Sequence, residues 1–170
     1  MFDPIQMQGL IRYANRARIK DEDLAQHSYS VAFYCFQIAE QYNIPEDTRN
    51  KAIAMAIVHD IGEVYTSDLP HDVKYQNPEL KELCDKLECN YIYKDIPEVY
   101  ELWCEAEEKK TIPAIIVKIA DSMSVRAYAE REILLGNRTA EMQQIFENAK
   151  DRIDKQIDIL NRRLSKWGEK

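Results

Sequence analysis

The dipeptide His59-Asp60 stands at the end of an uninterrupted apolar run, residues 52–58. Such a run belongs in a protein interior, where an unpaired carboxylate is too costly to bury. A divalent metal ion would compensate the carboxylate, because imidazole and carboxylate are both ligands of zinc-like metals. Two further residues, His27 and Asp121, lie inside segments predicted to be helical and extend the pair to a candidate site.

These four side chains predict a metal centre. Two neutral imidazoles and two carboxylates balance a dication and leave coordination positions for water and substrate. Mixed nitrogen and oxygen ligands suit one divalent transition metal (Co, Mn, Ni, Fe or Zn), whereas an all-oxygen set is typical of Mg or Ca.

Each ligand candidate also has a simpler interpretation. A helical histidine such as His27 can be a hydrogen-bonded core residue, and His59-Asp60 can be a helix-end pair. Asp121 can form an ion pair with Lys118 or Arg126. A shared metal explains all of these residues at once, whereas the simpler readings require a separate explanation for each.

Two acidic residues follow the dipeptide. Glu63 lies one helical turn beyond His59, so a continuous helix would place both on one face. A carboxylate there can hydrogen-bond a water at the metal and transfer protons during hydrolysis. Asp68 either forms a turn through its side chain or supplies a second acid to the site.

The elements that must position these residues are helices. Only 4 glycines and 6 prolines interrupt the chain, which favours long helices over short strands and turns. A short helix is expected at 5–13 and an ordered loop at 66–78. Apolar periodicity and helix breakers predict further helices at 21–42, 46–64, 79–94, 98–110, 113–135 and 138–165. The fold class is therefore all-α, and each of three central helices carries part of the candidate site.

The last predicted helix, about 138–165, carries an apolar stripe at alternating three- and four-residue steps. Either docking onto the other helices or a subunit interface would use this stripe, and docking is the favoured interpretation. The stripe consists of Met142, Ile145, Ala149, Ile153, Ile157, Leu160 and Leu164.

Length and composition restrict the class of protein. The 170 residues fit a single domain, 1–170, and the net charge of −7 argues against wrapping nucleic acid. The 4 cysteines form no CxxC pair, so neither a zinc knuckle nor a thioredoxin-like motif is indicated. Since no apolar stretch reaches membrane-spanning length and no leader is visible, a cytoplasmic protein is expected.

An ordered set of motifs over about residues 8–135 resembles the HD-domain phosphohydrolases, and most closely their 5′-deoxyribonucleotidase branch typified by YfbR. The motifs are Arg12-Tyr13, Gln26-His27-Ser28, His59-Asp60 with Glu63, Thr66-Ser67-Asp68-Leu69-Pro70, Val73-Lys74-Tyr75 and Lys118-Ile119-Ala120-Asp121. The resemblance implies a compact HD-domain helical bundle that forms a homodimer. It also implies one divalent metal, held by His27, His59, Asp60 and Asp121.

The same resemblance assigns roles to the remaining motif residues. It implies Glu63 and Asp68 as catalytic acids and Arg12 as the phosphate-binding residue, with Lys74 a weaker candidate. Tyr13 stands where the family typically has Trp, which changes the stacking against sugar or base. Gln26 replaces the usual Glu before the first histidine and could alter the surroundings of the metal.

The leading functional hypothesis is metal-dependent hydrolysis of deoxynucleoside 5′-monophosphates to deoxynucleoside and phosphate. The alternative is a deoxynucleoside triphosphate triphosphohydrolase with the same metal site, in which Arg16, Arg18 and Lys20 are available for the phosphate tail. A guanosine-tetraphosphate hydrolase is disfavoured, because that branch has a Glu-Asp pair where Glu63 is followed by Val64. A non-catalytic helical module is the remote alternative.

Overall fold

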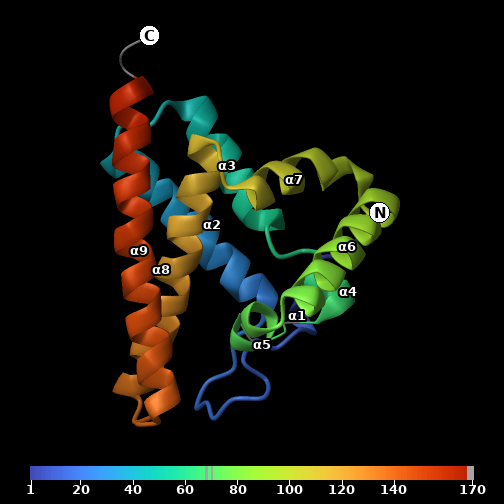
Figure 1. Cartoon of the computed structure of the whole chain (residues 1–170), viewed down its shortest axis with the longest axis vertical. Coiled ribbons are helices and arrows are strands. Elements are labelled where there is room, and N and C mark those ends of the chain that lie inside the picture. The colour runs from blue at the N-terminus through green and yellow to red at the C-terminus, as the bar shows by residue number, and fades with distance from the viewer. Residues whose placement is uncertain (68, 70, 168–170) are drawn as a thin grey trace.

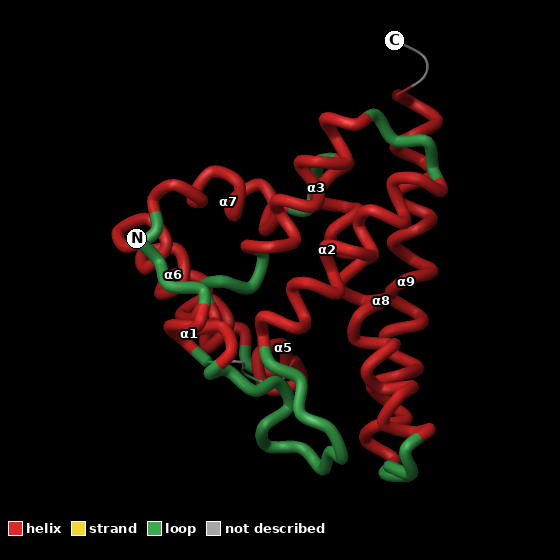
Figure 2. Tube along the Cα trace, turned by 180° about the vertical axis from the view of Figure 1, so that it is seen from behind, coloured by secondary structure: helices red, strands yellow, loops and turns green. Residues whose placement is uncertain are grey.

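The structure is a computed structural model that describes residues 1–67, 69 and 71–167, and Asp68 lies outside these residues. Within the described residues the chain forms helices and no strand, apart from a single bridge between Ile11 and Asp23 (Figure 2). The predicted all-α class is therefore confirmed.

Four long helices form the main core. Helices α2 (Leu24–Gln41), α3 (Glu46–Val58) and α8 (Ile112–Leu134) pack against one another, and α9 (Ala140–Trp167) runs antiparallel along α8 (Figure 1). Residues such as Val31, Met55 and Ile116 are completely buried between them. Burial of such side chains stabilises each helix by roughly 1.5–3 kcal/mol per residue.

The remaining helices of the described residues form an arm beside this core (Figure 1). The arm contains a second apolar cluster that joins the end of α3 to the arm's own helices, through residues such as Ile61, Ile92 and Trp103. Its elements are α1 (Ile5–Gln8), α4 (Glu63–Thr66), α5 (His71–Gln76), α6 (Pro78–Asp95), the short 3₁₀ helix η1 (Pro97–Val99) and α7 (Tyr100–Glu108).

Local signals in the sequence begin the helices that carry the candidate site. Asp23 accepts a hydrogen bond from the backbone N–H of Gln26, and the Gln26 side chain accepts one from the backbone of Asp23, which completes a capping box for α2. Thr111 caps α8 by accepting a single hydrogen bond from the backbone N–H of Ala114. Gln26 is exposed, and its side chain is engaged in this cap.

The predicted helix 46–64 is wrong at its end, because α3 stops at Val58 and a tight turn follows. The backbone N–H of Ile61 bonds to the carbonyl of Val58 at 3.1 Å, and that of Glu63 bonds to the carbonyl of Asp60 at 3.0 Å. These i→i−3 bonds tighten the chain, so Glu63 begins α4 instead of standing one turn beyond His59 on one helix.

Two shorter predictions also needed correction. The helix expected at 5–13 ends at Gln8, because the following residues pair with the chain before α2: Arg12 N–H bonds to Glu22 O at 2.9 Å and Leu24 N–H to Leu10 O at 3.0 Å. The loop expected at 66–78 contains α5. Periodicity detects neither pairing between distant segments nor a helix of so few residues.

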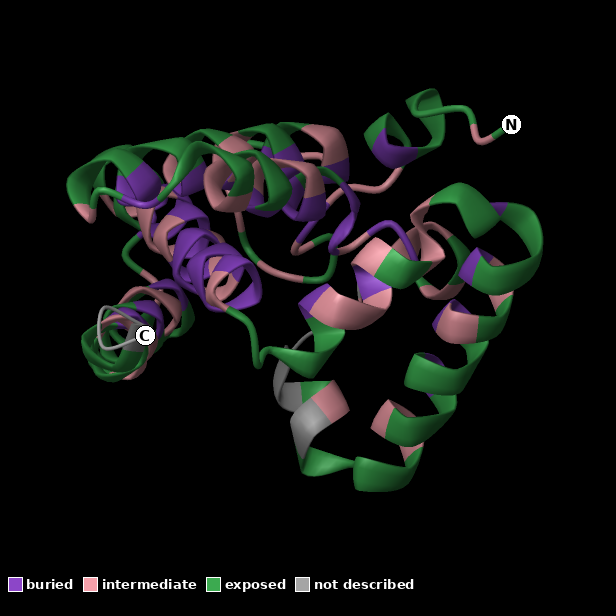
Figure 3. Ribbon diagram, turned by 90° about the horizontal axis from the view of Figure 1, so that it is seen from above, coloured by how far each residue is buried: buried purple, intermediate pink, exposed green. Residues whose placement is uncertain are grey.

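The apolar stripe of α9 docks on the core, as the sequence predicted. Met142, Ala149, Ile153 and Leu160 are buried, with α9 lying along α8 (Figure 3). Among the described residues, none of the helices combines the length and the apolar character that crossing a bilayer requires.

A buried carboxylate at the end of α8 fixes the loop that follows Tyr13. Glu132 is completely buried and accepts hydrogen bonds from the backbone N–H groups of Ile19 and Lys20, each at 2.7 Å. The Asn137 amide donates to Glu132 and to the carbonyl of Ala17, both at 2.9 Å. Burial alone would raise the pKa of Glu132, but these donors lower it below its usual value.

We predict that Glu132→Ala lowers the free energy of unfolding by about 3 kcal/mol, because two buried backbone N–H groups lose their acceptor. Since the folded state lowers the pKa of Glu132, its contribution is present near neutral pH and is lost as the pH falls through the folded-state pKa. Urea denaturation at neutral and acidic pH measures the difference, which should narrow in acid. Glu130→Ala, an exposed change on the same helix, is the control. Equal stability of the two variants at neutral pH would contradict the anchoring role.

Candidate metal centre and active site

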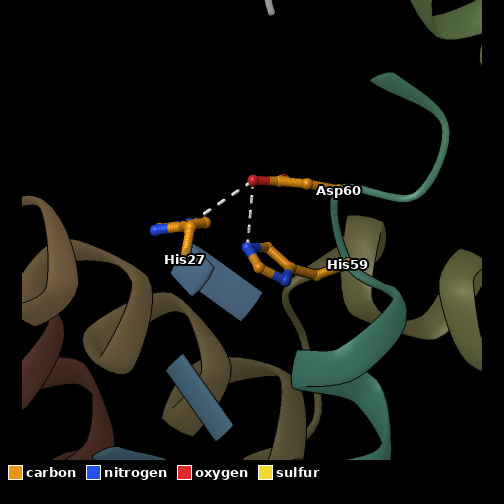
Figure 4. A group of neighbouring side chains, drawn as sticks. All are labelled: His27, His59 and Asp60. Carbon is orange, nitrogen blue, oxygen red and sulfur yellow. Dashed lines mark ion pairs between the residues drawn. The ribbon is translucent and has the colours of Figure 1, made fainter. Parts of the chain in front are cut away.

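Three of the four predicted ligands meet where α2 and the end of α3 come together. The ligand atoms of His27, His59 and Asp60 all lie within 4.8 Å of one another (Figure 4). Asp60 Oδ2 is 3.1 Å from His59 Nε2 and 3.5 Å from His27 Nε2. His27 is fully buried and His59 nearly so, whereas the side chain of Asp60, which points toward both, is 23% exposed.

The two imidazoles are oriented as metal ligands require. His59 Nδ1 lies 2.8 Å from the carbonyl oxygen of Ala56, and His27 Nδ1 lies 3.1 Å from the hydroxyl of Ser124 on α8. Among the described residues, the Nε2 atoms of both histidines are buried without a hydrogen-bond partner. A ligating histidine has this arrangement, with one ring nitrogen held by the protein and the other presented to the ion. The residues therefore fit a divalent transition metal.

Asp121 is positioned by α8 on the other side of His27. Its Oδ1 lies 3.5 Å from His27 Nε2, and its Oδ2 accepts a hydrogen bond from Lys118 at 2.7 Å. Burial raises the pKa of Asp121, but Lys118 and His27 outweigh it and hold the pKa well below the usual range. The ion pair with Lys118 is thus present together with the approach to His27, so it does not compete with the fourth-ligand role.

Neighbouring charges raise the pKa of His59 and lower the pKa of Asp60. Burial lowers the pKa of His59, but the neighbouring Asp60 more than offsets this and raises it to about 9. Burial raises the pKa of Asp60, yet the two histidines and Arg12 bring it well below its usual value. The cluster therefore stabilises positive charge at the point where the Nε2 atoms converge.

Arg12 and Tyr13 form the wall of the site next to Asp60. A guanidinium nitrogen of Arg12 lies 3.2 Å from Asp60 Oδ2, and its Nε lies 3.7 Å from a carboxylate oxygen of Glu22. The Tyr13 ring stacks on Tyr128, with centroids 5.0 Å apart and an angle of 9° between the planes. Tyr13 also has a positive φ of 55°, which turns the chain sharply after Arg12. One ring face is covered by Tyr128, so sugar or base stacking would have to use the other.

Glu63 and Lys74 face each other at the opposite wall. Lys74 Nζ lies 3.4 Å from Glu63 Oε1, and both side chains are largely buried. Burial lowers the pKa of Lys74, but the carboxylates of Glu63 and Glu88 outweigh it and raise the pKa above its usual value. The pair thus keeps a permanent cation close to the proposed proton-transfer group.

A third carboxylate, Glu88 on α6, supports this wall. Its Oε1 accepts a hydrogen bond from the Thr66 hydroxyl at 2.6 Å and lies 3.5 Å from Lys74 Nζ. A Cβ added at Gly62 would stand 2.8 Å from the Glu88 Cβ, so glycine is needed for α6 to approach this closely. Glu88 therefore holds both Lys74 and the end of α4 in place.

One groove of about 660 Å³ joins these walls. Its lining includes all the predicted site residues except His27, which is buried beneath it, and Asp68, which lies outside the described residues: Arg12, Tyr13, His59, Asp60, Glu63, Lys74 and Asp121.

The sequence interpretation missed Glu22, Glu88 and Ser124. The two glutamates stand in charged segments that read as exposed. Ser124 carries a usable signal, because it lies one turn beyond Asp121 on the same helix face and so points to the same site.

A family model described as 5′-deoxynucleotidase YfbR-like matches residues 5–166. The chain belongs to this family. It is 27% identical over 159 residues to a 5′-deoxynucleotidase of Vibrio vulnificus, covering 88% of this chain and 79% of that protein. It is also 27% identical over 123 residues to the dATP triphosphohydrolase of cyanophage S-2L, covering 67% and 66% of the two chains.

The fold comparison agrees with the family assignment. An HD-domain phosphohydrolase from Listeria innocua superposes with a TM-score of 0.77 at 21% identity, over 92% of this chain and 79% of that one. As a YfbR-like protein, the chain is a hydrolase with an HD-domain fold.

We predict that Asp121→Asn weakens metal binding by at least about tenfold, because it replaces the carboxylate of a candidate ligand with a neutral amide and removes the negative charge beside Lys118. Metal content after equilibration with Co²⁺ or Mn²⁺ and dialysis measures the effect. Glu130→Gln, on the exposed face of the same helix, makes the same chemical change away from the site and should retain full metal content. Full occupancy in Asp121→Asn would remove Asp121 from the ligand set.

Proposed function

We propose that this YfbR-like protein hydrolyses deoxynucleoside 5′-monophosphates to deoxynucleosides and phosphate, in the cytoplasm. The observation that carries the proposal is the pair of buried Nε2 atoms of His27 and His59, which converge on Asp60 beneath a groove walled by Arg12 and Lys74. Metal ligands and phosphate-binding cations thus share one groove, and the family match supports the substrate class.

We assign one divalent transition metal, Co, Mn, Ni, Fe or Zn, to His27, His59, Asp60 and Asp121. The mixed imidazole and carboxylate set suits these metals. When bound, such a metal supplies a Lewis acid that polarises the phosphate and activates water. The chain's own residues bind the phosphate, orient it and move the protons.

Arg12 binds the substrate phosphate in this proposal. Its guanidinium lies against Asp60, 3.2 Å away, at the edge of the metal centre. Arg12 directs its donors to a phosphate oxygen and stabilises the charge that develops during attack. Lys74 supplies a second cation from the opposite wall.

Glu63 and Asp68 manage the protons. Glu63 lines the groove beside His59 and Asp60, where it can accept a proton from the attacking water. Donation of a proton to the departing 5′ oxygen is assigned to Asp68 on the family resemblance. Tyr13, held by its stack on Tyr128, forms the wall for sugar and base.

The second candidate is the triphosphohydrolase reaction, which the cyanophage relative supports. Two of the loop cations that the sequence offered for a phosphate tail are engaged elsewhere. Arg18 pairs with Asp21 at 2.6 Å and donates to two backbone carbonyls, and Arg16 pairs with Glu141. These contacts favour a monophosphate on this side of the groove.

We predict that the protein, loaded with Co²⁺ or Mn²⁺, releases phosphate from dAMP and other deoxynucleoside monophosphates, and loses this activity when the metal is removed by a chelator. A phosphate-release screen of deoxy- and ribonucleotides, with and without metal, is the test. No release from any deoxynucleoside monophosphate with any of the five metals would refute the proposal.

Arg12→Ala separates phosphate binding from metal binding in the same assay. It should reduce kcat/KM by at least about a hundredfold, since a charge-assisted phosphate contact is lost, while metal content is retained. Arg49→Ala, which removes an arginine on α3 outside the groove, is the matched control.

We further propose a homodimer formed through an exposed aromatic stripe on α2. Tyr29, Phe33 and Phe36 are 72%, 52% and 41% exposed, and they repeat at helical spacing. Contiguous exposed apolar surface of this kind marks interaction sites. A two-fold contact would bury the same stripe from both copies.

We predict that Phe33→Glu converts the dimer to a monomer, because it places a charge in the apolar contact. Light scattering coupled to size-exclusion chromatography measures the mass. Tyr93→Glu makes the same kind of change at an aromatic residue of α6 that is 62% exposed and should leave the mass unchanged. A monomeric wild-type protein, or a dimeric Phe33→Glu variant, would rule out this interface.

A further inference from the structure

The groove extends from the metal centre onto α9. Its lining includes Asp121 and Lys118 on α8 and, on the neighbouring helix, Arg152 and Lys155. Helices α8 and α9 are antiparallel and joined by the short turn around Gly136, so positions equally far from that turn lie at the same level (Figure 1). Arg152 and Lys155 therefore stand at the level of Asp121 and Lys118.

The cations on α9 differ from the others that line the groove. Lys74 pairs with Glu63 and Glu88, and Lys81 pairs with Asp85. Arg152 and Lys155, by contrast, form no ion pair with any residue that the structure describes, and the Nε of Arg152 is buried without a hydrogen-bond partner there. A buried guanidinium nitrogen without an acceptor is costly, and an anion would satisfy it.

Charge identifies the kind of ligand that would satisfy these groups. The chain carries a net charge of −7, yet on α8 and α9 the cations Lys118, Arg152 and Lys155 outnumber the acids Asp121 and Asp151 at this corner of the groove lining. The base and sugar of a nucleotide are neutral, which leaves its phosphates as the groups that such cations recognise. Lys118 already touches the metal-ligand candidate Asp121, so the corner begins where the attacked phosphate is held.

We propose that Lys118, Arg152 and Lys155 form a second anion subsite, which binds the β- and γ-phosphates of a deoxynucleoside 5′-triphosphate. The inference rests on the proposed function, because it places the α-phosphate at the same metal centre. Water then forms a bond to the α-phosphorus and the bond from phosphorus to the 5′ oxygen breaks. The 5′ oxygen takes up a proton, and the products are deoxynucleoside and inorganic triphosphate.

Competition kinetics with excess free Mn²⁺ test the subsite. The inhibition constant of dATP against dAMP hydrolysis should rise by about tenfold or more in the Arg152→Gln/Lys155→Ala double variant, since two charge-assisted contacts are lost. The KM for dAMP should stay within about twofold, because a monophosphate has no group at this corner. Lys150→Ala removes a lysine from α9 outside the groove lining and serves as the control.

Two further measurements keep the result unambiguous. Because Arg152 is half-buried, Lys155→Glu alone provides a charge reversal at an exposed position and should weaken dATP in the same direction. 2′-Deoxyadenosine 3′,5′-bisphosphate carries its extra phosphate elsewhere and should be insensitive to the changes. Parallel losses for dATP and dAMP, no loss for either, or a selective loss for the bisphosphate would overturn the subsite.

The proposed function and the subsite can fail independently. Turnover of dAMP by the wild-type protein tests the former. The subsite is tested without turnover by the increase in Tm. In the same variants, the increase that dATP produces is compared with the increase that dAMP produces. If dAMP is not hydrolysed but dATP stabilises the wild type more than the double variant, the subsite stands alone.

Discussion

The core of the protein buries polar and charged side chains whose charges and hydrogen-bonding groups are only partly satisfied by other side chains. His27 and His59 present ring nitrogens without hydrogen-bond partners to the same point, next to the carboxylates of Asp60 and Asp121. Groups of this kind are costly in a protein interior unless a partner arrives. The helices α2, α3 and α8 supply these groups from three distant parts of the chain. The packing of these helices in the core therefore also sets the positions of the candidate ligands.

Most of the surrounding polar contacts offset the same cost. Lys118 bonds to Asp121, Arg12 lies against Asp60, and Ser124 and the Ala56 carbonyl occupy the remaining ring nitrogens.

A second set of contacts lies further from the candidate ligands. Glu22 supports Arg12 and Glu88 supports Lys74, so the two cations that flank the metal-ligand candidates each have a carboxylate behind them. Truncating one of these glutamates would therefore act through the cation that it holds.

The sequence predicted the long helices that carry the candidate site better than the chain path between them. Long amphipathic segments specify α2, α8 and α9, because 3.6-residue periodicity accumulates over many turns. The turn after Val58 has no such periodicity. The sequence interpretation therefore continued one helix through Glu63, whereas α3 ends at Val58 and Glu63 begins α4. Glu88 could not be found, because its burial depends on the distant Gly62, which lets α6 approach the wall closely. A contact between residues so far apart in the chain leaves no recognisable pattern in the sequence around either residue.

Helix α8 carries Asp121 at the candidate metal centre and Glu132 at the anchor of the loop that leads from Arg12 and Tyr13. The backbone of α8 therefore fixes the distance between Asp121 and the loop anchor Glu132. Each residue inserted into or removed from an α-helix rotates everything beyond it by about 100°. The stretch between these two acids should consequently resist any change of length during evolution, whereas the exposed tip of the loop is free to grow or shrink.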